Sequence, residues 1–304
     1  MQRLFPAHWY VSHRERFLYQ PRNRRLRRTR ILNRLRGQGL VERIHRPGGG
    51  SSAWFTTDTG AQLVEGRGGV TARRYRMTPV RAAGPLRDHT LATVEAGLAF
   101  LEHARRRGDR LHPLGWTPEV AHRHRDGSRG AFSSRHVISD AVMSYVLRTE
   151  AAEYPLWCFL EVDRATMPVH RVAAKIRAYE RYRDYVPQLR GRAPRTIGEL
   201  EAHAWKQRYG PVFPALLIVL DGAGERLLRT RMRDLAAAVR RTEPSYSQRW
   251  KLRIGVTLLP WLKDAGPAAG VFLPLHSNDD ALVDLRLASD GISASEVRTL
   301  ERPR

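Results

Sequence analysis

The feature that most constrains the fold is the run Phe159–Arg164 (Phe-Leu-Glu-Val-Asp-Arg), where an apolar segment ends in two carboxylates. The apolar residues from Leu156 onward have the length of a buried strand, and alternation along a strand places Glu161 and Asp163 on one face. A buried carboxylate is costly unless it is paired, hydrogen-bonded or bound to a metal. The fold must therefore bring partners for both carboxylates to a central strand.

An upstream acid and a downstream lysine complete a chemically suggestive pattern. Asp140 lies in a second apolar run, 137–147, and Lys175 lies on an expected helix over 169–185, on the same face as Tyr179. Asp140 and Glu161 on adjacent strands can supply the oxygen ligands that Mg²⁺ or Mn²⁺ prefers, with Asp163 as a third ligand or an outer acceptor. Lys175 can act on a phosphate or on the attacking water, so the pattern favours metal-dependent phosphodiester cleavage.

Two more acids are candidates for the same catalytic site, and other interpretations stay open. Glu95 can contribute from an expected helix over 88–107, and Glu119 from the end of a short strand at 111–116. Alternatively, arginines neutralise Glu161 and Asp163, and Asp140 is an ordinary strand-end acid. A zinc site is disfavoured, because the chain has one cysteine and the histidines are loosely spaced: His122, His124 and His136.

The charge of the chain indicates its partner. The 304 residues carry a formal net charge of +23, which favours a polyanion, nucleic acid first. No apolar run approaches the roughly 20 residues of a membrane span, and no signal peptide is recognisable. The single Cys158 fits a reduced core residue, so we expect a cytoplasmic protein associated with the nucleoid or a plasmid, without a membrane partner.

The N-terminal third has the pattern of a winged helix-turn-helix. Residues 22–36 hold eight arginines and no acid, and this expected helix stops at Gly37-Gln38-Gly39. Expected strands at 40–45 and 53–57 flank a glycine-rich tip, which would form the wing. The first helix of such a domain is absent, and residues 1–6 resemble the tail of a second. An arginine-rich helix can also be a solvated face, but with a wing it favours duplex DNA contacts through Arg22, Arg24, Arg25, Arg27, Arg28, Arg30, Arg34 and Arg46.

The order of expected elements gives the fold class. After a linker at 67–87, the pattern is helix, three strands, helix, strand, helix and strand, and the last two strands lie at 215–220 and 252–259. This order predicts an α/β (α+β) sandwich with a mixed sheet over residues 88–289. We expect a winged helix over 1–66, a basic insertion at about 186–212 and a tail at 290–304.

These motifs together resemble the replication-relaxation family of plasmids and integrated elements. The resemblance covers roughly residues 1–275. Its most specific motif is Phe159–Arg164, and weaker ones follow the same order: the arginine-rich helix, Gly39-Leu40-Val41, Leu63, His89–Ala92, Trp116-x-x-Glu119, Ser139-Asp140-Ala141, Lys175-x-x-x-Tyr179 and the strand at 215–220.

The resemblance implies a role in replication and DNA relaxation, with a second domain similar to the PD-(D/E)xK nuclease fold. In that fold Asp163 occupies the place of the motif lysine, and Lys175 would be a lysine that has migrated to the next helix. The implied activity is nicking or cleavage of DNA with Mg²⁺ or Mn²⁺. The alternative is a non-catalytic replication accessory factor or transcriptional regulator; a homodimer and relaxosome partners are open in both cases.

Overall fold

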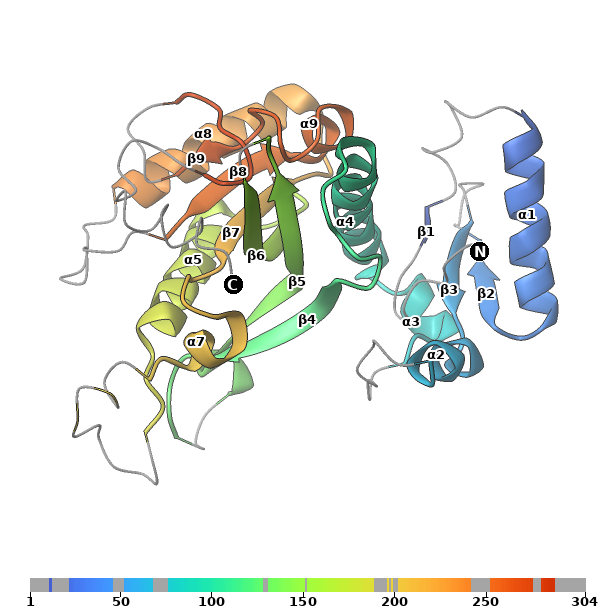
Figure 1. The fold of residues 1–304 in the computed structure, drawn as a ribbon, viewed down its shortest axis with the longest axis horizontal. Helices are drawn as coiled ribbons and strands as arrows, with labels where there is room; N and C mark the ends of the chain where they lie inside the picture. Colours follow the sequence, from blue (N-terminus) through green and yellow to red (C-terminus); the bar gives the residue numbers. More distant parts are fainter. Residues whose placement is uncertain are drawn as a thin grey trace. The chain divides into compact units, whose positions relative to one another are not determined.

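The computed structural model describes residues 11–12, 22–45, 52–67, 76–127, 131–150, 152–188, 196, 198, 202–241, 252–275 and 280–287, with side chains from residue 28 onward. The chain divides into two compact units, a first unit (Met1–Leu98) and a second unit (Ala99–Arg304) (Figure 1). The predicted helix tail at 1–6, the tip residue Arg46 and the tail at 290–304 lie outside the described residues.

The first described helix of the first unit is the arginine-rich α1 (Arg22–Gly37), which confirms the predicted helix. Its end is a Schellman motif, in which the N–H of Gly39 donates to the carbonyl of Arg36 and that of Leu40 donates to Leu35. Gly39 has φ +70°, the left-handed conformation that this motif needs and that favours glycine. The chain therefore turns sharply into the next strand.

Three described strands form an antiparallel sheet in the order β1-β3-β2, comprising β1 (Val11–Ser12), β2 (Val41–Ile44) and β3 (Ala53–Thr56). Helix α2 (Asp58–Glu65) follows and is capped by Thr57, whose hydroxyl accepts from the N–H of Gly60 and donates to the Gly39 carbonyl. Helix α3 (Pro79–Ala83) lies in the range predicted as a linker. The small core consists of Ala53, Phe55, Met77, Ala82 and Leu91, the last from α4 (Arg87–Arg107).

The second unit is built on a mixed sheet, which confirms the α/β class. Its described strands lie in the order β4-β5-β6-β7-β8-β9, with bounds Trp116–Arg123, His136–Arg148, Glu153–Asp163, Ala215–Leu220, Ile254–Leu258 and Leu273–Pro274. The first three strands and the β8–β9 pair are antiparallel, whereas β6, β7 and β8 run parallel. The predicted strand at 215–220 and the central strand are confirmed.

Helices cover both faces of this sheet. Val142 packs in the cluster shared with α5 (Val169–Asp184) and α8 (Glu225–Arg240), whereas Tyr145 meets Phe100 of α4 on the opposite face. The remaining described helices are α7 (Ala204–Tyr209), α9 (Leu259–Asp264) and a 3₁₀ turn at Phe132–Ser134. No described helix is long and apolar enough to cross a membrane.

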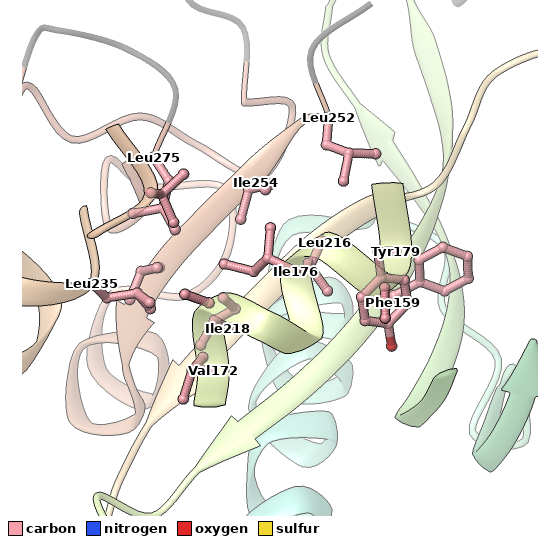
Figure 2. Close-up of a cluster of buried hydrophobic side chains, with 14 of the residues drawn as sticks. Phe159, Val172, Ile176, Tyr179, Leu216, Ile218, Leu235, Leu252, Ile254 and Leu275 are labelled. Atoms are coloured by element: carbon pink, nitrogen blue, oxygen red, sulfur yellow. The ribbon is translucent and has the colours of Figure 1, made fainter. Parts of the chain in front are cut away.

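The core beneath α5 fixes the position of that helix. Val172, Ile176 and Tyr179 share its inner face and pack on strand residues that include Phe159 and Ile218 (Figure 2). The rings of Phe159 and Tyr179 stack with centroids 5.1 Å apart. Because apolar burial holds this helix on the sheet, the polar residues between these positions have defined directions.

One predicted strand is wrong. We expected a strand at 111–116, but β4 spans Trp116–Arg123. Its buried positions include Pro118 and His122, which a strand pattern disfavours. β4 lies at the edge of the described sheet, where a proline removes no needed ladder donor, so this sequence is tolerated.

Candidate functional site

The candidate site lies where β5 and β6 stop pairing. Their ladder runs from Arg148–Glu153 to Ala141–Leu160 and ends there. Beyond it, the Asp140 carboxylate accepts the N–H of Val162 at 2.7 Å through Oδ2, in place of a strand carbonyl. The two strands therefore part with Asp140 on one and Glu161 on the other.

Lys175 of α5 joins these two acids. Its Nζ donates a short hydrogen bond to Glu161 Oε2 and lies 3.9 Å from Asp140 Oδ1. The Glu161 side chain is 9% exposed, Asp140 16% and Lys175 35%, so the cluster is buried at the strand and reaches solvent at the lysine. Of the predicted catalytic residues, the structure thus brings Asp140, Glu161 and Lys175 together.

The electrostatics of this cluster follow from its burial. Burial raises the pKa of the Glu161 carboxyl to about 8, with Asp140 adding to the shift and Lys175 opposing it. For Lys175, burial lowers the pKa, but the attraction of Glu161 and Asp140 outweighs this and the pKa is raised. Two acids and one lysine in a poorly solvated place leave an excess of negative charge when all three are ionised.

Tyr179 is a part of this cluster that the sequence placed near Lys175 but not in the site. Its hydroxyl donates a short hydrogen bond to Glu161 Oε1, and its ring is fully buried. Both oxygens of Glu161 therefore have partners on α5, one turn apart. The spacing Lys175-x-x-x-Tyr179 was the signal, since residues four apart on a helix share a face.

Asp163 has a different partner. Its Oδ2 accepts from Arg231 Nε of α8 at 2.5 Å, and its Oδ1 accepts the N–H of Ala165 at 3.0 Å. Both side chains of the ion pair are almost buried, at 5% and 12% exposure. Within the described residues, no group of three or more His, Cys, Asp or Glu side chains is arranged to hold a metal. The structure thus groups Asp163 with Arg231 and not with Asp140 and Glu161.

Glu119 lies beside Asp140 on the neighbouring strand β4. The pairs Pro118–Ala141 and Val120–Ser139 flank this position, and Glu119 itself has φ +52°, which is strained for a residue with a side chain. Regular alternation also breaks here, because Val137 and Val142, five residues apart, both join the cluster beneath α5. Glu119 is exposed at this distortion.

Glu95 lies on the part of α4 that belongs to the first unit, where it is half-buried. Its predicted catalytic role therefore stays a prediction, as do the metal roles of the other acids.

Comparison with known proteins identifies the family of this chain. A model of the family described as replication-relaxation matches residues 14–196, more than half of the chain. The chain belongs to the replication-relaxation family. This membership indicates a role in the replication or relaxation of mobile elements. No curated protein and no solved structure gives a significant match.

The replication-relaxation match covers all the acids of the central strands. Asp163 lies inside the matched range with Asp140, Glu161, Lys175 and Tyr179, whereas Arg231, the partner of Asp163, lies beyond it. The match also includes α1, where Arg30 and Arg34 are exposed and Arg28 is half-buried. Nothing is described of the side chains of the other arginines predicted to contact DNA, which are Arg22, Arg24, Arg25, Arg27 and Arg46.

Proposed function

We propose that this replication-relaxation protein binds duplex DNA and nicks or cleaves it with Mg²⁺ or Mn²⁺. The observation that carries the proposal is the convergence of Asp140, Glu161 and Lys175 where β5 and β6 part. A carboxylate from each of two strands and a lysine from a packed helix form the acidic and basic groups that such cleavage requires.

The donor set fits a divalent cation. Asp140 Oδ1 and Glu161 Oε2 both face the Lys175 ammonium, so this place already attracts positive charge. Mg²⁺ is commonly held by one or two carboxylates and completes its shell with water and substrate phosphate. When bound there, the metal would supply Lewis-acid activation of the phosphate and a water of lowered pKa.

The residues of the chain have separate tasks in this proposal. Asp140 and Glu161 would hold the cation, and the buried Tyr179 limits how Glu161 can turn. Lys175 is the most exposed member of the cluster, so its ammonium is the group that can leave Glu161 and pair with a phosphate oxygen. The arrangement also supports the PD-(D/E)xK likeness, with the lysine supplied by α5 instead of β6.

The first unit would hold the DNA. A basic helix, a tight Gly39 turn and a two-stranded ribbon follow one another as in a winged helix-turn-helix, which would lay α1 in the major groove. Arg30 and Arg34, one turn apart and exposed, can then contact phosphates or bases. Partner proteins and a homodimer remain predictions.

A second function is favoured by one observation. Glu161 already has a lysine and a tyrosine on its two oxygens, so the cluster is satisfied by protein groups alone. The same geometry therefore suits a DNA-binding accessory factor whose second unit has kept the fold without cleavage.

Incubation of the purified chain with supercoiled plasmid separates the two functions. The cleavage proposal expects nicked or linear product that depends on Mg²⁺ or Mn²⁺ and is lost in Asp140→Asn and Glu161→Gln. A matched control is Asp184→Asn, an exposed acid at the end of α5. Product that persists in both site variants, or that is equally lost in the control, refutes the assignment of this site.

A further inference from the structure

A buried chain of polar side chains leads away from Glu161 on the side opposite to Lys175. Glu161 Oε1 accepts from the Tyr179 hydroxyl, and Ser139 interacts electrostatically with Tyr179. Ser139 Oγ lies 3.1 Å from His122 Nε2. Tyr179 and Ser139 are fully buried and His122 is 2% exposed, so the chain runs through the core beneath α5.

The directions of these bonds are set by what each group can donate. In the ionised state that would hold a cation, a carboxylate only accepts, so Tyr179 gives its one hydroxyl proton to Glu161. The Ser139 hydroxyl donates to the Val120 carbonyl at 3.3 Å and accepts from the Nε2–H of His122.

Four elements contribute to this chain, which gives it rigidity. His122 comes from β4, Ser139 from β5, Tyr179 from α5 and Glu161 from β6. The His122 ring packs on Phe159 and Tyr182, with centroids 4.7 and 4.9 Å away. A carboxylate whose outer oxygen is fixed by packed groups cannot rotate freely.

We infer that Tyr179 is a positioning residue, which with Ser139 and His122 fixes Glu161 Oε1 and presents Oε2 toward Asp140 and Lys175. The role rests on the proposed function, since presenting Oε2 serves a cation shared with Asp140. Nothing in this role requires Tyr179 to touch DNA or the reacting phosphate.

Tyr179→Phe tests this inference, because it removes the hydroxyl and keeps the ring. Tyr182→Phe is the matched control: it lies one turn further on the same helix, it is buried, and its hydroxyl bonds no other described residue. Mn²⁺ binding to the full chain is followed through the spin-resonance signal of the free ion. We expect Tyr179→Phe to weaken binding about 10- to 100-fold, the usual loss for an outer partner of a metal ligand. Equal binding by wild type and Tyr179→Phe overturns the positioning role.

A double-mutant cycle measured without metal distinguishes failure of the positioning role from failure of the proposed function. Urea unfolding is measured for wild type, Tyr179→Phe, Glu161→Met and the double variant. We expect Tyr179→Phe to raise the unfolding equilibrium constant about tenfold or more when residue 161 is Glu. When residue 161 is Met, we expect a far smaller increase. The same loss in both backgrounds overturns the inference. Absence of Mn²⁺ binding by the wild type, with coupling intact, refutes the proposed function alone.

Discussion

The Asp163–Arg231 pair gives the sharpest stability prediction. Arg231→Met would leave a carboxylate that is 5% exposed facing an apolar side chain, with only the Ala165 N–H as a hydrogen-bond donor among the contacts described above. Removing one partner of a buried ion pair typically costs about 3–5 kcal/mol, because the remaining charge is uncompensated. We expect a loss in that range for Arg231→Met, since both side chains are almost fully buried.

The double variant Asp163→Asn/Arg231→Met separates the pair from its individual side chains. Because it removes both charges, we expect it to be more stable than Arg231→Met alone, by about 1–3 kcal/mol. Urea unfolding followed by circular dichroism measures each value. Single variants that each lose less than about 1 kcal/mol, with additive effects, would refute the reasoning. Asp163→Asn should also leave Mn²⁺ affinity unchanged if the aspartate serves Arg231.

Three further predictions test other parts of the chain. Gly60→Ala should destabilise the first unit by about 2 kcal/mol or more, because its Cβ would lie 2.0 Å from the Leu40 carbonyl oxygen; thermal unfolding measures this, and an unchanged Tm contradicts it. Burial, assisted by Arg208, lowers the pKa of His122 from 6.5 to about 3. Stability present above pH 6.5 is therefore lost as pH falls toward 3, by up to about 1.4 kcal/mol per unit, and urea titrations of His122→Phe should show a shallower fall. Neutralising Arg30 and Arg34 together should reduce the log–log salt slope of duplex binding by about 2, whereas an unchanged slope excludes them from the interface.

The sequence predicted elements well where one pattern dominated. The apolar run before Glu161 and the run at 215–220 became adjacent parallel strands, because continuous apolar residues suit a strand covered on both faces. The spacing of Val172, Ile176 and Tyr179 likewise gave α5 and so the approach of Lys175. Local periodicity is enough to set these features.

Partners distant in the sequence could not be predicted in this way. Asp163 meets Arg231, 68 residues later, and no local pattern distinguishes this arginine from the many others. The range expected to be a basic insertion contains α7, whose Trp205 and Tyr209 are buried against the sheet. Two apolar rings in a basic segment are too weak a signal, and their burial depends on tertiary packing.

The account depends most on the claim that Asp140, Glu161 and Lys175 form a metal-dependent site. The most direct measurement is the initial rate of supercoiled plasmid nicking with Mg²⁺ or Mn²⁺, compared among wild type, Lys175→Met and the control Lys206→Met on α7. We predict metal-dependent product, a rate about 10²–10³-fold lower in Lys175→Met, as for other charge-stabilising groups, and little change in Lys206→Met. No metal-dependent product from the wild type, or equal rates in all three proteins, would contradict the account.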